Sequence, residues 1–305
     1  MKIAVLYGGV SAEREVSLST GKQIIAALES KGHEVIGIDF HPSRLHEVLE
    51  IEADVVFLGL HGRFGEDGRL QGLLDMLNIP YVGSGALASG IAMDKAKSKQ
   101  FFKEAGINIA KEKVLYKKSY NEDQLELSFD FPAVVKPNRE GSTIGLTIAQ
   151  NREELLKGVA EAFIHDDTVL VEQFVSGKEV TVAVMGEHGQ LQALPVVEIE
   201  PKNAYYDYES KYAEGGSVHH VPARVDEETT ALLQKQAIAA HEVLGCEVYS
   251  RVDFIIPHDG SQPVILEVNT LPGMTPTSLF PDAAKEVGMD YPTMIEKLIE
   301  LSLKK

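Results

Sequence analysis

Short apolar runs separated by glycine-rich turns recur along the first ninety residues of the chain. Residues 2–7, 34–40 and 54–60 each have the length and composition of a buried strand, and residues 11–31 have those of a helix. Strands that alternate with helices are typical of a parallel sheet. Ligands bind at the carboxyl ends of such strands, so the segments after residues 7 and 60 are candidate binding loops.

The rest of the chain also alternates strand and helix patterns, and some of its strands are predicted to pair as hairpins. The predicted strands cover residues 132–137, 168–175, 180–185, 191–199, 251–256 and 264–269, and the predicted helices cover residues 151–163, 226–244 and 282–304. Residues 282–304 are predicted to form one or two helices, the second with Pro292 near its start. These patterns predict an α/β protein with ample core for two or three domains in 305 residues.

Charge and cysteine content narrow the class of protein. The net charge is −17, from 29 Lys and Arg against 46 Asp and Glu, which argues against nucleic acid or an anionic membrane as a general partner. Cys246 is the single cysteine, so no internal disulfide can form and a reducing compartment fits. No apolar stretch is long enough for a signal peptide or a membrane span, and we expect a cytoplasmic protein.

The strands 251–256 and 264–269 carry polar residues on one face of an otherwise apolar pair. Side chains two positions apart share a face, so Arg251 lies beside Asp253 and Glu267 beside Asn269. A hairpin centred on Gly260 sets Asp253 opposite Glu267 and Arg251 opposite Asn269, with Cβ atoms about 5 Å apart, unless a bulge breaks the register.

Two carboxylates this close repel each other unless a cation lies between them. Carboxylate and amide oxygens are hard ligands that suit magnesium, which takes its other ligands from water and phosphates. We therefore interpret the hairpin of Asp253, Glu267 and Asn269 as a metal–phosphate platform, with Arg251 beside it for developing negative charge. A surface hairpin with a solvated acidic face is the alternative.

Cations that could bind phosphate precede this hairpin in the chain. Lys136 stands among apolar residues in a predicted strand, where a lysine needs an anion to keep its charge. The loop 139–145 that follows is bounded by glycines, and its backbone N–H groups could close over phosphates; a plain hairpin tip is the alternative. Lys95 belongs to a lysine-rich helix face that either neutralises phosphate or is simply solvated.

Candidate substrate contacts lie in the N-terminal loops and in a tyrosine-rich segment. Glu13 either satisfies a helix dipole or binds a substrate ammonium at the end of the first strand. His61 follows the third strand, and it either contacts substrate or is structural. The polar segment 203–217, with four tyrosines in eight positions, is typical of a functional loop or lid. His219 and His220 are adjacent and cannot share one strand face.

A dinucleotide fingerprint supplies a competing hypothesis. Gly83, Gly85 and Ala88 match G-x-G-x-x-A before a predicted helix, and Glu104 follows at roughly the expected distance. This match would indicate a dinucleotide-dependent oxidoreductase, but it leaves Lys136, Asp253 and Glu267 unexplained. A non-catalytic nucleotide-sensing module on the same fold is a third possibility, although such a module would lack the carboxylates that this chain retains.

Taken together, the motifs resemble those of D-alanine–D-alanine ligases of the ATP-grasp class, and the resemblance covers essentially the whole chain. The matching motifs are Gly-Gly-Val-Ser-Ala-Glu (8–13), Leu-His-Gly-Arg (60–63), Met-Asp-Lys (93–95), Val-Lys-Pro-Asn-Arg-Glu-Gly-Ser (135–142), Tyr-Asp-Tyr-Glu-Ser-Lys-Tyr (206–212), Arg-Val-Asp (251–253) and Glu-Val-Asn-Thr-Leu-Pro-Gly-Met (267–274). The resemblance implies an N-terminal parallel-sheet, Rossmann-like domain (1–88) and a two-part ATP-grasp fold (89–176 and 177–305).

The resemblance also implies an activity. ATP phosphorylates the carboxylate of one D-alanine, and the amine of a second D-alanine attacks the acylphosphate to give D-alanyl-D-alanine, ADP and phosphate for peptidoglycan precursor synthesis. Phosphoryl transfer depends on positioning and charge neutralisation, which fits the cations noted above. The implied partners are ATP as co-substrate, D-alanine and two Mg²⁺ ions, with Mn²⁺ as an alternative, and the implied assembly is a homodimer through the N-terminal domain.

Roles for individual residues follow from the same resemblance. The implied roles are metal binding by Asp253, Glu267 and Asn269; ATP phosphate binding by Lys95 and Lys136, with Ser142 and Thr143 in the loop that closes over the nucleotide; adenine and ribose contacts by Glu172, Gln173, Val175 and Glu179; first-substrate contacts by Glu13, Ser142, Tyr212 and His61; second-carboxylate contacts by Lys211 and Ser278; and oxyanion stabilisation by Arg251 and the Gly273 N–H. The segment 203–217 is implied to be the lid that excludes water from the acylphosphate.

One position bears on specificity, and two others depart from the commonest pattern of the family. Relatives that form the D-alanyl-D-lactate ester carry another residue at the position of Tyr212, so this chain resembles the amide-forming enzymes. Thr143 replaces a frequent Ser but keeps the hydroxyl. Gln173 replaces a frequent Lys beside the adenine with a neutral amide that can still reach the base, which bears on nucleotide affinity and not on the reaction.

Overall fold

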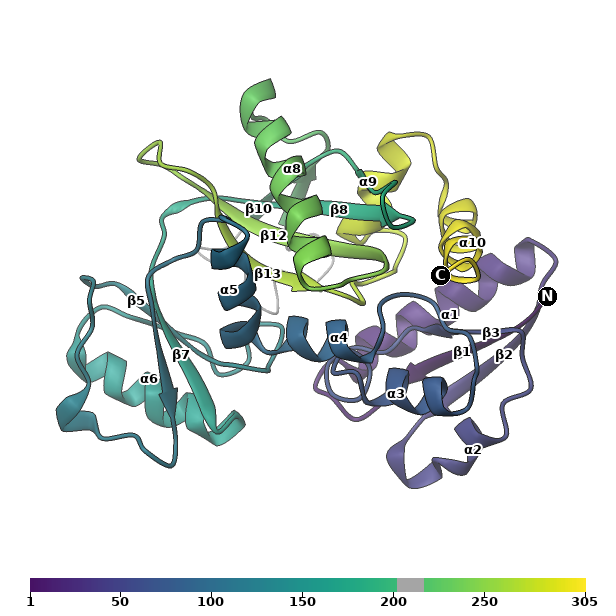
Figure 1. Ribbon diagram of the computed structural model, residues 1–305, viewed down its shortest axis with the longest axis horizontal. Coiled ribbons are helices and arrows are strands. Elements are labelled where there is room, and N and C mark those ends of the chain that lie inside the picture. Colours follow the sequence, from purple (N-terminus) through teal and green to yellow (C-terminus); the bar gives the residue numbers. More distant parts are fainter. Residues whose placement is uncertain (202–216) are drawn as a thin grey trace.

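The computed structural model describes residues 1–201 and 217–305, in which three β-sheets form three bodies (Figure 1). The first body is a parallel sheet in the order β2-β1-β3. Its elements are β1 (Lys2–Gly8), α1 (Arg14–Ser30), β2 (Glu34–Phe40), η1 (Pro42–Arg44), α2 (His46–Leu49), β3 (Val55–Leu58) and α3 (Arg69–Met76). The four residues of β3 and the middle of β1 are fully buried, as expected for a parallel sheet covered on both faces.

Two consecutive helices, α4 (Ala86–Met93) and α5 (Lys95–Glu104), lead from this body to the second one. The second sheet is antiparallel, in the order β4-β7-β5-β6, and α6 lies against it (Figure 1). Its elements are β4 (Glu112–Tyr116), η2 (Glu122–Gln124), β5 (Ala133–Pro137), β6 (Thr147–Ala149), α6 (Arg152–His165) and β7 (Thr168–Gln173). Asn151 caps α6 by accepting the Glu154 N–H, which explains where that helix begins.

The third sheet is the largest, with the order β11-β10-β8-β12-β13 and β9 beside β8. Its elements are β8 (Gly177–Gly186), β9 (Gln192–Ala193), β10 (Val197–Pro201), β11 (Ser217–His220), α8 (Glu227–Val243), β12 (Val248–Pro257), β13 (Val264–Asn269), α9 (Leu279–Glu286) and α10 (Tyr291–Ser302). One apolar face packs on α4, α5 and α8. The other face carries apolar residues under α9 and, farther along the strands, the polar side chains described below.

The hairpin register predicted from the sequence is confirmed. Asp253 pairs with Glu267, and Arg251 pairs with Asn269. The register shifts directly after Asp253, where Phe254 pairs with Ile265, so a bulge exists but falls on the turn side of the polar pairs. The bulge therefore leaves all four polar side chains on one face.

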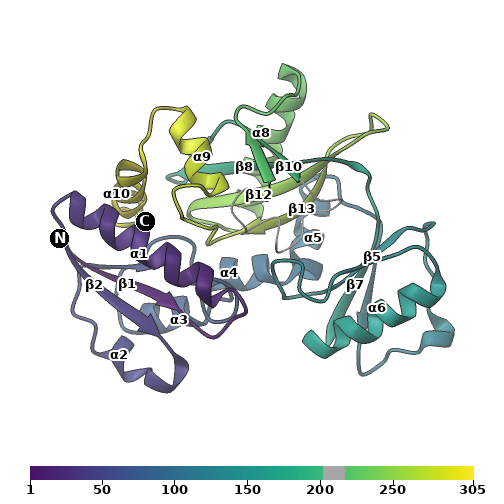
Figure 2. The same cartoon turned by 180° about the vertical axis from the view of Figure 1, so that it is seen from behind.

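The end of the chain returns to its beginning. Figures 1 and 2 both show α10 lying beside α1, and Glu296 of α10 contacts Lys31 and His33. Residues of α10 and of the parallel sheet belong to one continuous hydrophobic core. None of the described helices is both long enough and apolar enough to cross a membrane.

Candidate active site

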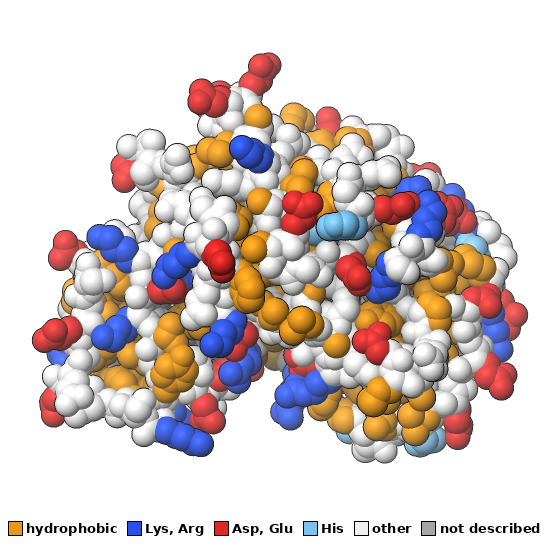
Figure 3. Space-filling view, viewed as in Figure 1, with side chains coloured by type: hydrophobic (Ala, Val, Ile, Leu, Met, Phe, Trp, Pro, Cys, Tyr) orange, Lys and Arg blue, Asp and Glu red, His pale blue; other side chains and the backbone are white. Residues whose placement is uncertain are grey.

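A cavity of about 1000 Å³ lies where the N-terminal sheet, the loop after β5 and the third sheet meet. In the space-filling view of Figure 3, a notch separates the second body, at lower left, from the first, at lower right. Eleven of the predicted site residues line the cavity. They are Glu13, His61, Lys95, Ser142, Glu179, Arg251, Asp253, Glu267, Asn269, Gly273 and Ser278.

Glu13 and Ser142 meet at the N-terminal side of the cavity although 129 positions separate them. Glu13 occupies the N-cap position of α1, which begins at Arg14 and not at residue 11 as its pattern had indicated. The Ser142 hydroxyl donates to Glu13 Oε1 at 2.5 Å. Ser142 and Thr143 have φ values of 51° and 62°, a conformation that is costly for a β-branched residue and is often found at functional sites.

The loop that contains Ser142 is both a hairpin connection and part of the site. The loop joins β5 to β6, which pair antiparallel, so its topology is that of an ordinary hairpin connection, the alternative given above. Gly141 and Ser142 nevertheless line the cavity, and Lys95 Nζ donates to the Glu140 carbonyl at 2.8 Å. The residues on either side of Gly141 therefore both make contacts that hold the loop against the cavity wall.

His61 is buried beside the same carboxylate. Its Nε2 lies 3.3 Å from the Thr20 hydroxyl. Burial lowers the pKa of the His61 ring by more than the nearby Glu13 carboxylate raises it. The ring is therefore neutral at neutral pH and can donate or accept a hydrogen bond without adding positive charge.

Glu66 is a cavity residue that reasoning from the sequence did not select. The Gly62 N–H donates to Glu66 Oε2 at 2.6 Å, which folds the glycine-rich loop after β3 back on itself. Burial, reinforced by the neighbouring Glu13 carboxylate, raises the pKa of Glu66 to about 8. The sequence does place the Glu66 carboxylate four residues after Gly62, in a loop at the end of a strand. The residue pattern of a loop does not show which side chains are buried, so Glu66 could not be selected from it.

Asp253 is the centre of the polar face of the hairpin. Its carboxylate accepts bonds from Arg251 Nε at 2.9 Å and Nη2 at 2.8 Å, from the Thr181 hydroxyl at 2.6 Å and from Asn269 Nδ2 at 2.9 Å. Glu267 Oε2 lies 3.2 Å from Lys95 Nζ. Asp253 is buried and both of its carboxylate oxygens accept hydrogen bonds, so the alternative of an acidic hairpin face that is simply solvated is wrong.

The donor set of this hairpin fits magnesium. Two opposed carboxylates and an amide oxygen are hard ligands, and their like charges are balanced here by the Lys95 and Arg251 side chains. The part of the chain that the structure describes contains no group of three His, Cys, Asp or Glu side chains able to hold a metal ion by itself. Water and phosphate oxygens would therefore supply the remaining ligands, as is usual for Mg²⁺.

Lys99, which the sequence did not single out, joins Lys136 in a buried ion-pair cluster around Glu172. Lys99 Nζ lies 2.6 Å from Glu172 Oε1, and Lys136 Nζ lies 2.6 Å from Glu172 Oε2. Burial alone would raise the pKa of Glu172, but the two lysines outweigh it and lower that pKa to about 2. Lys95 and Lys99 are both buried, so the solvated-face reading of this helix is wrong for them.

Five predicted nucleotide contacts do not line this cavity. Lys136, Glu172, Gln173 and Val175 come from β5, from β7 and from the chain that follows it, and Thr143 lies in the loop after β5. Lys211, Tyr212 and residues 203–216 of the predicted lid lie outside the described residues. Among the described residues, the structure thus brings the predicted substrate, metal and oxyanion residues to one cavity, and it places most of the predicted adenine contacts in the second body.

The segment after β13 completes the cavity. A Cβ added at Gly273 would lie 3.2 Å from Ser278 Oγ, so a larger residue there would crowd the serine. Ser278 Oγ accepts the Thr275 N–H at 3.1 Å, and Ser278 is the N-cap residue of α9. The Gly273 backbone and the Ser278 hydroxyl are therefore held at the same edge of the site.

The dinucleotide alternative fails on packing. The glycine turn at 83–85 is closed by the end of the chain, because Lys305 Nζ donates to the Gly83 carbonyl at 2.7 Å. A Cβ at Gly83 would lie 3.1 Å from the Tyr249 ring. The fingerprint glycines thus pack against protein in the place where a pyrophosphate would have to lie.

A parallel N-terminal sheet followed by two further sheets, with cations and opposed carboxylates between them, defines the ATP-grasp class of enzymes. Within that class, the chain belongs to the D-alanine–D-alanine ligase family. The family model described as "D-ala D-ala ligase C-terminus" matches residues 101–300, and "D-ala D-ala ligase N-terminus" matches residues 42–84.

Known D-alanine–D-alanine ligases are similar to this chain over its full length. A D-alanine–D-alanine ligase from Halalkalibacterium halodurans is 64% identical over 305 residues, with all of both chains covered. The crystal structure of D-alanine–D-alanine ligase from Bacillus anthracis has a TM-score of 0.86 at 36% identity, covering 100% of this chain and 98% of that one. A crystal structure of D-alanine–D-alanine ligase from Bacillus anthracis complexed with ATP has a TM-score of 0.83 at 34% identity, covering 100% of this chain and 98% of that one.

Proposed function

We propose that the chain is an ATP-dependent ligase that joins two D-alanine molecules through an acylphosphate. The observation that carries this proposal is the cavity in which the Glu13–Ser142 pair faces the opposed Asp253 and Glu267 carboxylates, with Lys95 between loop and hairpin. Family membership and the likeness to a ligase complexed with ATP support the same reaction.

The first D-alanine binds at the N-terminal side of the cavity. Glu13 is a buried carboxylate held by Ser142, and it receives the substrate ammonium. His61 stays neutral beside it, so it orients the substrate without repelling the ammonium. The substrate carboxylate then points toward Arg251 and the hairpin, where negative charge develops during phosphoryl transfer.

ATP binds across the second and third sheets. Lys95 and Lys136 bind its phosphates with the Ser142–Thr143 loop, while Glu172, Gln173 and Val175 line the adenine pocket and Glu179 holds the ribose. Asp253, Glu267 and Asn269 would hold two Mg²⁺ ions, or Mn²⁺, which neutralise phosphate charge when bound. Lys95 contacts both the Glu140 carbonyl of this loop and the Glu267 carboxylate of the hairpin, which supports a position for Lys95 beside the transferred phosphate.

The second D-alanine enters at the edge formed by the segment after β13. Ser278, with Lys211, takes its carboxylate. The amine of this second D-alanine attacks the acyl carbon of the acylphosphate to give a tetrahedral intermediate, and the carbon–oxygen bond to phosphate then breaks, which releases phosphate and a proton as the amide forms. Arg251 and the Gly273 N–H stabilise the oxyanion. Tyr212 completes the set around Glu13, as the family resemblance implies.

Four broader proposals accompany the reaction. The product serves peptidoglycan precursor synthesis, and the protein works in the cytoplasm. It forms a homodimer through the N-terminal body, which light scattering after size-exclusion chromatography would test. Residues 1–88, 89–176 and 177–305 act as the substrate, central and C-terminal domains.

The direct test mixes the protein with ATP, magnesium and D-alanine, and measures phosphate and dipeptide together. We expect one phosphate for each dipeptide, and no dipeptide with L-alanine as the matched control. D-alanine-independent ATP hydrolysis alone, or NADH binding with no ligation, would contradict the proposal.

A further inference from the structure

A histidine–aspartate pair lines the cavity, and the reaction described above assigns it no role. His219 Nδ1 lies 2.7 Å from Asp282 Oδ2, and His219 Nε2 lies 3.2 Å from the Ser217 hydroxyl. All three residues line the main cavity. Because a carboxylate only accepts, Nδ1 carries a proton, and the pair is a charge-assisted hydrogen bond between β11 and α9.

Asp282 stands one helical turn from the serine assigned to the second substrate. Ser278 occupies the N-cap position of α9, and the Asp282 N–H donates to the Ser278 carbonyl at 2.9 Å. Side chains four positions apart share one face of a helix. An acidic residue in the first turn of α9 also suits the helix dipole, but the dipole does not explain why a histidine of another element meets it.

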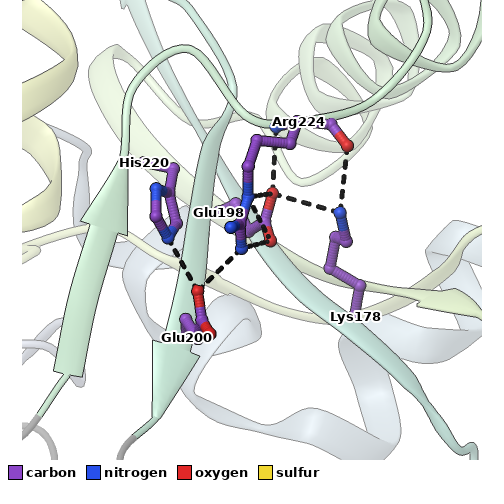
Figure 4. A network of polar contacts seen from close by, with 5 residues as sticks. All are labelled: Lys178, Glu198, Glu200, His220 and Arg224. Carbon is purple, nitrogen blue, oxygen red and sulfur yellow. Dashed lines mark hydrogen bonds and ion pairs between the residues drawn. The ribbon is translucent and has the colours of Figure 1, made fainter.

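The contact between His219 and Asp282 lies on one face of β11, and the next residue, His220, lies on the other face. His219 pairs across the strands with Ile199, and both residues line the cavity. His220 points to the other face, where its Nε2 lies 2.8 Å from Glu200 in a network with Arg224, Glu198 and Lys178 (Figure 4). The prediction that adjacent histidines could not share a face is thus confirmed.

We propose that His219 and Asp282 are positioning residues for the second D-alanine. The pair fixes the first turn of α9 against β11, and so holds the Ser278 hydroxyl at the edge of the cavity where the second carboxylate binds. The inference rests on the proposed ligase function. It assigns the pair to the acceptor side, because the first substrate's contacts come from α1, from the loop after β3 and from the loop after β5.

The test resolves the KM values for the first D-alanine, the second D-alanine and ATP in the full-length protein. His219→Ala and Asp282→Ala should each raise the KM for the second D-alanine about tenfold, the loss expected when a charge-assisted hydrogen bond no longer holds Ser278. The other two KM values should stay within about twofold. The double variant should be no worse than either single one, because both remove the same contact.

Two further variants separate positioning from general damage. His219→Gln keeps an N–H that can reach Asp282 and should recover most of the acceptor affinity, while His220→Ala, on the opposite face of β11, should leave that affinity unchanged. Circular dichroism confirms folding of each variant.

An unchanged acceptor KM in folded His219→Ala overturns the inference, and so does an equal rise in all three KM values or a change confined to ATP. Absence of dipeptide from the unaltered protein overturns the proposed function and this inference together, whereas normal turnover with an unmoved acceptor KM overturns the inference alone.

Discussion

Replacing Glu172 with Gln should destabilise the second body by several kcal/mol. The side chain of Glu172 is 4% exposed, and that of Lys99 is 0% exposed. The ion pair with Glu172, at 2.6 Å, compensates the charge of the fully buried Lys99. Gln has nearly the same shape, so the variant removes one charge and leaves the buried Lys99 and the largely buried Lys136 facing an amide.

The size of the effect follows from the pKa of Glu172. Lowering it from 4.5 to about 2 corresponds to about 3 kcal/mol of stability at neutral pH, at about 1.4 kcal/mol for each pKa unit. Removing one partner of a buried ion pair costs about 3–5 kcal/mol in other proteins, which agrees. Because the folded-state pKa is depressed, this stability is present above pH 4.5 and is lost as the pH falls toward 2.

Urea unfolding followed by circular dichroism measures the difference directly. At pH 7, Glu172→Gln should unfold at clearly lower urea than the unaltered protein, and the gap should narrow as the pH falls below 4.5. Glu153→Gln is the matched control, because Glu153 pairs with Lys157 on the surface of α6 with 79% of its side chain exposed, and such pairs contribute less than about 1 kcal/mol. A Glu172→Gln protein within 1 kcal/mol of the unaltered one at pH 7, or a gap that ignores pH, would refute this reasoning.

Three other substitutions test the site. The pKa of Glu66 is raised to about 8, so stability that is present below pH 4.5 is lost as the pH rises toward 8. Glu66→Gln lacks this loss, so its melting temperature should rise relative to that of the unaltered protein between pH 5 and pH 8.5. A difference in melting temperature that stays constant over this range would argue against a buried neutral acid. Ser142→Ala removes the 2.5 Å bond to Glu13 and should lower kcat/KM for the first D-alanine by about 10–100-fold, and an unchanged kcat/KM would argue against a role for the Glu13–Ser142 pair. Glu267→Gln should lower dipeptide formation at least about 1000-fold while circular dichroism stays unchanged; a rate like that of Glu153→Gln would contradict the metal assignment.

Local pattern was sufficient for much of the fold and for the central hairpin. Strand alternation has a period of two, so the spacing of Asp253 and Glu267 about the turn at Gly260 already determined that they face each other. Helix starts marked by capping residues were also readable, as at Asn151 and Asp226. These features depend on residues close in sequence, and their geometry changes little with the surroundings.

Only the tertiary structure decided which charges are buried and which elements face each other across the cavity. Lys99, Glu66 and the His219–Asp282 pair acquire their environments from elements far away in the chain, and no local periodicity encodes that packing. The meeting of Glu13 with Ser142 likewise depends on how the N-terminal sheet and the loop after β5 are brought together. Burial and long-range contact are properties of the assembled core, so the electrostatics of this site could be read only after the chain had folded.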